Sequence, residues 1–75
     1  MGEIKSDKRE DILDVAERLF AEQGFEAVSV REISRVADIN IAMVSYYFGS
    51  KEKLYEEVIN RKLISTELIR SKILE

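Results

Sequence analysis

Residues 29–54 read SVREISRVADINIAMVSYYFGSKEKL, and they contain most of the signals that define the fold. Ser29, Asn40 and Ser50 are residue types that favour the position before a helix, where a side-chain oxygen accepts a hydrogen bond from a free backbone N–H group. Ser29 and Glu32 also have the spacing of a capping box, in which each side chain bonds the other residue's amide. Apolar residues follow each start at helical spacing. We therefore predict three helices, over residues 30–37, 41–48 and 51–74.

A longer helix is predicted upstream. Its apolar residues recur three and four positions apart, which predicts a helix over residues 8–23 with one buried face. Ser6 or Asp7 can cap its start. Gly24 can supply the left-handed residue that ends it, and Phe25 can then pack back on the helix. We expect the hydrophobic core to contain Ile12, Ala16, Leu19, Phe20, Ile33, Val44, Phe48, Leu54 and Val58.

Two of the predicted helices are short and close together in the chain. The helices over residues 30–37 and 41–48 are separated only by residues 38–40. Helices of this length need to pack against other elements to be stable. Two short helices joined by a tight turn and braced by a longer helix describe a helix-turn-helix. In this motif the second helix lies in the major groove of DNA, although bundles that do not bind DNA share the same outline.

The composition excludes several classes of protein. The chain has 75 residues, enough for one domain, and it contains no Cys and no His. These absences exclude a disulfide, a thiolate metal site and a cysteine nucleophile, and they remove the commonest general base. The longest apolar run, Ile41 to Val44, is far too short to cross a membrane. We therefore expect an all-α soluble domain in a reducing compartment that is not an enzyme and has no cofactor and no metal.

The net charge of −3 is unevenly distributed along the chain. Residues 1–28 carry twice as many acidic as basic side chains, and residues 54–75 carry equal numbers. Residues 29–53 are the only segment with a positive balance, which favours contact with nucleic acid at this segment. We interpret the acidic side chains near the start as a solvated face; they are Glu10, Asp11, Asp14 and Glu17.

Residues 8–60 resemble the DNA-binding domain of the tetracycline-repressor (TetR) family of bacterial transcription regulators. The longest matching motif is Tyr46 to Leu54, which is similar to the family's aromatic-Phe-x-Ser-Lys-Glu-x-Leu signature. Three positions depart from the family pattern. Asp38 stands where glycine is usual, Ser34 where alanine is usual, and Ser45 where an aromatic residue is common. The other matching residues are Ile12, Leu13, Ala16, Leu19, Phe20, Gly24, Phe25, Ser29, Val30, Arg31, Glu32, Ile33, Val36 and Ala37.

The resemblance implies a homeodomain-like domain that binds double-stranded DNA, and a cytoplasmic regulator that represses transcription by occluding a promoter. It also implies palindromic operator half-sites and a homodimer in the full-length parent, whose C-terminal domain would bind a small-molecule effector. We accordingly expect a flexible N-terminus over residues 1–7, the DNA-binding domain over residues 8–60, and a continuation of the last helix over residues 61–75. The effector and dimerisation domain would then be absent, as in an excised, truncated or designed domain.

Helix starts and aromatic side chains predict contacts with DNA phosphates. Because a helix N-terminus binds anions, the starts at Ser29 and at Ser50 and Lys51 are candidate phosphate sites. A tyrosine hydroxyl can bond a phosphate while its ring packs, and we expect one of Tyr46 and Tyr47 to be half-buried and the other to face DNA. The resemblance implies the same roles for Ser29, for one of the two tyrosines and for Lys51.

Base recognition is expected from one arginine and from the exposed face of the helix over residues 41–48. Arg31 can donate two hydrogen bonds to a guanine. The helix face is largely apolar, so it can contact thymine methyl groups but offers few hydrogen bonds. The predicted base-reading residues are Arg31, Ile41, Ala42, Met43 and Ser45.

Simpler interpretations remain open. Ser29 and Ser50 can be helix caps alone. Arg31 can be a solvated side chain, and Lys51 can pair with a nearby carboxylate. The apolar face over residues 63–74 has no evident partner earlier in the chain, so it predicts self-association or, as an alternative function, a small helical protein-interaction module. The first six residues also fit the short pattern for N-myristoylation.

Overall fold

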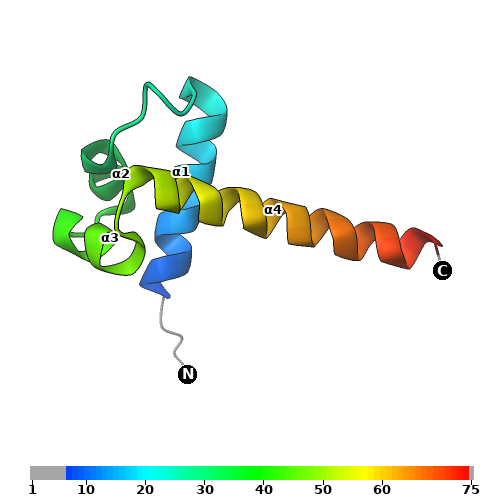
Figure 1. The fold of residues 1–75 in the computed structure, drawn as a ribbon. Helices are drawn as coiled ribbons and strands as arrows, with labels where there is room; N and C mark the ends of the chain where they lie inside the picture. Colours follow the sequence, from blue (N-terminus) through cyan, green and yellow to red (C-terminus); the bar gives the residue numbers. More distant parts are fainter. Residues whose placement is uncertain (1–6, 75) are drawn as a thin grey trace.

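The computed structural model describes the backbone of residues 7–74 and the side chains of residues 7–64. Its four helices are α1 (Lys8–Gln23), α2 (Val30–Ala37), α3 (Ile41–Phe48) and α4 (Lys51–Leu74). These bounds agree with the four predicted ranges and confirm the all-α fold class (Figure 1). The N-myristoylation pattern and most of the predicted flexible N-terminus lie outside the described residues.

Every helix begins at a polar side chain that accepts a hydrogen bond from the first turn. The acceptors are Asp7 (from the N–H of Arg9, 3.1 Å), Ser29 (from Glu32, 3.0 Å), Asn40 (from Ala42, 2.7 Å) and Ser50 (from Lys53, 3.1 Å). Each such cap stabilises its helix by about 1 kcal/mol. The Glu32 carboxylate, predicted to complete a capping box, accepts a hydrogen bond from Nε2 of Gln23 at 3.1 Å instead, because α1 ends beside the start of α2.

Two of the three described residues with positive φ angles, Asp38 and Gly24, change the direction of the chain. Asp38 adopts the left-handed conformation at φ 58° and ψ 48°, and the N–H group of Ile39 returns to the carbonyl of Ser34 at 3.0 Å. Gly24 ends α1 with φ 93° and ψ 155°. This ψ lies outside the left-handed helical region that we predicted, because the chain continues in an extended direction toward Phe25. Phe25 packs back on Phe20 as expected, with 5.7 Å between the ring centroids.

The helix α1 is the centre of the bundle, since it contacts each of the other three helices. In Figure 1, α2 and α3 lie to one side of α1, whereas α4 crosses α1 and extends well beyond it. The two short helices, α2 and α3, thus pack against the longer helix α1, as the helix-turn-helix prediction required. None of the helices, over the residues that the structure describes, combines the length and the apolar character needed to cross a membrane.

The core forms where these helices meet. All nine predicted core residues are buried, namely Ile12, Ala16, Leu19, Phe20, Ile33, Val44, Phe48, Leu54 and Val58. Sequence reasoning missed Leu13 and Val28. Val28 lies in the loop between α1 and α2, where helical periodicity gives no signal. Ser34, one of the departures from the family pattern, is also buried, and its hydroxyl donates to the carbonyl of Arg31 at 2.8 Å.

Candidate nucleic-acid interface

One face of α3 packs on the core and the opposite face is open. Val44 and Phe48 are buried, which fixes the rotation of the helix about its axis. Met43, predicted to read bases, is only half-exposed. The exposed residues of α3 are Ile41, Ala42, Ser45 and Tyr46. The helix therefore presents apolar and hydroxyl groups to its surroundings, with no charged side chain of its own.

The two tyrosines of α3 have different environments. Tyr46 is 83% exposed, whereas Tyr47 is half-buried and packs against the core. Their rings meet edge to face, with 5.6 Å between the centroids. As expected, one tyrosine is partly packed and the other faces outward. Tyr47 is the packed one and Tyr46 is the outward one.

The start of α2 is open to a ligand. Ser29 and Arg31 are exposed. The Oγ atom of Ser29 accepts a hydrogen bond from the N–H group of Glu32, but its own O–H group is still available as a donor. Backbone N–H groups at this end of the helix carry a partial positive charge that favours an anion. The geometry thus allows a phosphate contact at Ser29 in addition to its capping role.

The start of α4 differs from expectation at Lys51. Ser50 is exposed and caps the helix, as predicted. The Nζ atom of Lys51 donates hydrogen bonds to the main-chain carbonyls of Phe25 at 2.7 Å and of Val28 at 2.9 Å. It also lies 4.2 Å from the centroid of the Phe25 ring. The partner of Lys51 is therefore the loop between α1 and α2, and the carboxylate pairing that we considered is not the observed contact.

Three acidic residues of α1 form an ion-pair network with two cations of α4. Arg61 donates hydrogen bonds to Glu10 at 2.8 Å, Asp14 at 3.0 Å and Glu17 at 2.7 Å. The Nζ atom of Lys62 lies 3.0 Å from Oε2 of Glu17, the second oxygen of this carboxylate. Three of the four residues of the predicted solvated face, Glu10, Asp14 and Glu17, are therefore paired with cations, because α4 crosses α1 beside them. In the part of the chain that the structure describes, no group of three acidic, His or Cys side chains is placed to hold a metal ion.

The network also affects protonation. The hydrogen bonds of Lys62 and Arg61 hold the pKa of Glu17 below its ordinary value. Partial burial opposes the charge of Arg61, but the hydrogen bonds to Glu17, Asp14 and Glu10 outweigh it and raise the pKa of this guanidinium. Both groups are therefore charged at neutral pH, and much of the negative charge of α1 is balanced locally.

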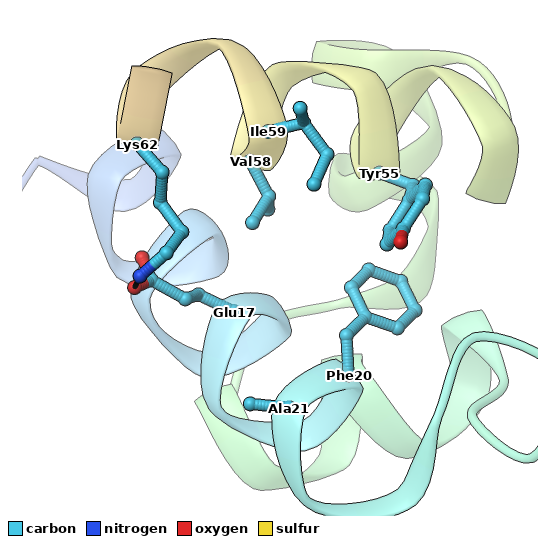
Figure 2. Close-up of a pocket in the computed structure, with 7 residues that line it drawn as sticks. All are labelled: Glu17, Phe20, Ala21, Tyr55, Val58, Ile59 and Lys62. Atoms are coloured by element: carbon cyan, nitrogen blue, oxygen red, sulfur yellow. Dashed lines mark hydrogen bonds and ion pairs between the residues drawn. The ribbon is translucent and has the colours of Figure 1, made fainter. Parts of the chain in front are cut away.

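A groove of about 220 Å³ lies between α1 and α4. Figure 2 shows that Phe20 of α1 points toward α4, from which Tyr55, Val58 and Ile59 line the groove. Ala21 of α1 also lines it. The Glu17–Lys62 ion pair closes one end (Figure 2). Apart from the hydroxyl of Tyr55, the rest of the lining is apolar, and the two charged groups bind each other.

Comparison with known proteins agrees with this arrangement. Residues 12–58 match the family model described as bacterial regulatory proteins, tetR family. The probable HTH-type transcriptional regulator YttP of Bacillus subtilis is 40% identical over 57 residues, which are 76% of this chain and 28% of that protein. The HTH-type transcriptional repressor NicS of Pseudomonas putida is 37% identical over 65 residues, covering 87% of this chain and 31% of that protein.

A solved structure is also similar. HlyIIR, a hemolysin II transcriptional regulator, superimposes with a TM-score of 0.68 at 47% sequence identity. The match covers 71% of this chain and 30% of the HlyIIR chain. This chain therefore spans about a third or less of the length of the regulators to which it is similar.

Proposed function

The chain belongs to the tetR family of bacterial regulatory proteins, and we propose that it binds double-stranded DNA by inserting α3 into the major groove. The matched region is the helix-turn-helix DNA-binding domain of the family, which is a family of transcription regulators and not of enzymes. The observation that carries the proposal is the orientation of α3. Its inner face is buried by Val44 and Phe48, which leaves Ile41, Ala42 and Ser45 outward.

Base recognition is assigned to Arg31 and to the outward face of α3. The exposed side chain of Arg31 has the donors to bond a guanine at two acceptors. Ile41, Ala42 and Met43 supply methyl and methylene groups that suit thymine methyls, and Ser45 supplies one hydroxyl. Since the face of α3 has few hydrogen-bonding groups, Arg31 carries much of the sequence preference.

Phosphate contacts are assigned to both sides of α3. The hydroxyl groups and first-turn N–H groups at Ser29 and Ser50 bind the backbone at the starts of α2 and α4. The hydroxyl of Tyr46 reaches a phosphate directly, and that of Tyr47 contributes from its packed position. These contacts set the register of the domain on the duplex. Lys51 is assigned a supporting role and no phosphate contact of its own, because its Nζ atom donates to the loop carbonyls of Phe25 and Val28.

The complete regulator is proposed to act in the bacterial cytoplasm as a homodimeric repressor on a palindromic operator. NicS and the KstR2 protein of Rhodococcus jostii are among the similar proteins that are described as transcriptional repressors. A dimer would place two helix-turn-helix units about 34–36 Å apart, or a multiple of that spacing. The family resemblance implies that a small-molecule effector would bind a C-terminal domain, and the matched region is less than a third of the length of YttP and NicS.

Selection of bound sequences from a random duplex pool tests the base-reading assignment. We expect Arg31→Ala to relax discrimination at one base pair by about 1–3 kcal/mol. Arg35→Ala, which removes an exposed arginine from the end of the same helix, is the control and should leave the preference unchanged. An unchanged preference in Arg31→Ala would contradict the assignment of Arg31.

Amide NMR titration with a mixed-sequence duplex at low salt tests the docking itself. Shifts clustered in α3 and at the starts of α2 and α4 are the expected result. Shifts confined to Leu63 and Ile64 would favour the alternative, a protein-interaction module, because these two side chains are 58% and 62% exposed. The remainder of that predicted apolar face, residues 65–74, has side chains outside the described residues.

A further inference from the structure

A single ammonium group connects the loop between α1 and α2 to the first residue of α4. The Nζ atom of Lys51 bonds the carbonyl oxygens of Phe25 and Val28, at 2.7 and 2.9 Å. Val28 is the residue immediately before the cap of α2, and Lys51 is the residue immediately after the cap of α4. The side chain therefore links the N-termini of two helices that are more than twenty residues apart in the chain.

The carbonyls that Lys51 binds belong to a loop, so they do not accept the main-chain hydrogen bonds that carbonyls within a helix accept. Charge-assisted hydrogen bonds are stronger than neutral ones, and the Phe25 ring adds a cation–π contact at 4.2 Å. On the other side of the loop, the Phe25 ring packs on Tyr55 with 4.9 Å between the centroids. Val28 is also anchored, being 1% exposed. The loop is thus fixed both by aromatic packing and by the ammonium group.

We propose that Lys51 is a positioning residue for DNA binding, which sets the separation between Ser29 at the start of α2 and Ser50 at the start of α4. This inference rests on the proposed function, in which those two helix starts bind phosphates. Phosphates on a duplex have fixed spacing, so two sites must be held at a matching separation before binding. Two of the three ammonium donors of Lys51 are used by Phe25 and Val28, so its main role is to hold the loop.

The central variant is Lys51→Met, which keeps an apolar stem of similar length and removes the ammonium group. We expect faster amide hydrogen exchange at residues 25–29 in the free protein. We also expect about tenfold weaker binding to a mixed-sequence duplex, with the slope of log affinity against log salt unchanged. Lys53→Met, at an exposed lysine in the same turn of α4, should leave exchange at residues 25–29 as in the wild type.

A double-mutant cycle with Ser29→Ala separates positioning from direct contact. If Lys51 acts through the start of α2, Ser29→Ala weakens binding much less in the Lys51→Met background than in the wild type. Full additivity would overturn the proposal. A salt slope that falls by about 0.9 in Lys51→Met, with loop exchange unchanged, would also overturn it, because Lys51 would then neutralise a phosphate itself.

Two further outcomes remain decisive. If the wild-type chain binds no duplex, the proposed function fails. The positioning role has its own test, because unchanged amide exchange at residues 25–29 in Lys51→Met would overturn that role alone. If Lys51→Met does not fold, Lys51→Arg replaces it, since arginine keeps the charge. In Lys51→Arg, the protection of residues 25–29 from amide exchange and the affinity for the duplex should be retained together or lost together. Loss of this protection with unchanged affinity would contradict the proposal.

Discussion

The guanidinium group of Arg61 on α4 donates a 2.7 Å hydrogen bond to the carboxylate of Glu17 on α1. The same group reaches Asp14 and Glu10, which lie one and two turns earlier on α1. The ion-pair network therefore spans two turns of α1 at the point where α4 leaves the core. It extends the contact between the two helices beyond Val58, the last buried residue of α4 among those described.

We expect Glu17→Gln to lower the free energy of unfolding at neutral pH by about 0.5–1 kcal/mol, a value typical of partly exposed ion pairs. The hydrogen bonds of Lys62 and Arg61 lower the pKa of Glu17 in the folded state. Its stabilising contribution is therefore fully present above its ordinary pKa of 4.5 and is lost as the pH falls from there through the lower folded value.

Urea unfolding of both proteins from pH 7 to pH 3 measures this effect. The stability difference between wild type and Glu17→Gln should narrow as the solution is acidified. Glu22→Gln, at an exposed glutamate near the end of α1, is the matched control and should change little at any pH. A Glu17→Gln difference that stays constant down to pH 3 would contradict the assigned pKa direction.

Asp38 in the turn between α2 and α3 carries backbone strain that glycine would relieve. The left-handed conformation costs a residue with a Cβ atom about 1–2 kcal/mol, partly offset here because Asp tolerates it. Glycine also gives the unfolded chain more conformational freedom, which reduces the gain in folding stability. We expect Asp38→Gly to stabilise the fold by about 0.5 kcal/mol and Asp38→Ala to destabilise it. A lower urea midpoint for Asp38→Gly would show that the aspartate side chain stabilises the turn.

The core tolerates little loss of volume. Leu54 is 0% exposed, and truncation of such a leucine costs about 2–5 kcal/mol. The total stability of a domain this small is about 4–11 kcal/mol, so Leu54→Ala should unfold a measurable fraction of the chain at 37 °C. Leu63→Ala on the same helix, at a side chain that is 58% exposed, should leave the circular dichroism melting curve nearly unchanged. Similar effects of both substitutions would argue against the described packing of α4.

Substitutions of the two adjacent tyrosines should differ in their effects on duplex binding and on stability. Removing the outward ring in Tyr46→Ala should leave the urea midpoint unchanged and weaken duplex binding by about 1–2 kcal/mol, roughly tenfold. Tyr47→Ala removes a half-buried ring, so we expect a loss of stability of about 1–2 kcal/mol. Fluorescence anisotropy with a labelled duplex gives the affinities. Unchanged affinity in Tyr46→Ala would remove Tyr46 from the proposed interface.

Helix positions were readable from residues close together in the chain. Ser29, Asn40 and Ser50 each accept a hydrogen bond two or three residues ahead, and such contacts are specified by local spacing. For the same reason, the apolar period identified nine of the eleven core residues that are buried in the described part of the chain. Val28 was missed because a loop has no period, so its burial depends on what packs over it.

The partners of the long charged side chains could not be read in this way. Lys51 binds carbonyls 23 and 26 residues away, and Arg61 binds carboxylates from 44 to 51 residues away. The local pattern around each shows only an exposed cation at a helix turn. The partner depends on the angle at which α4 crosses α1 and on the path of the loop before α2.

Local sequence thus specified four helices, their caps, their buried faces and the family, because hydrogen bonds and apolar periodicity within a helix act over three or four residues. Helix packing specified which tyrosine of α3 faces outward, that Lys51 holds the loop before Ser29, and that Arg61 joins α4 to α1. These features depend on short distances between elements far apart in the chain. Such elements come close only when the core residues of all four helices have packed together.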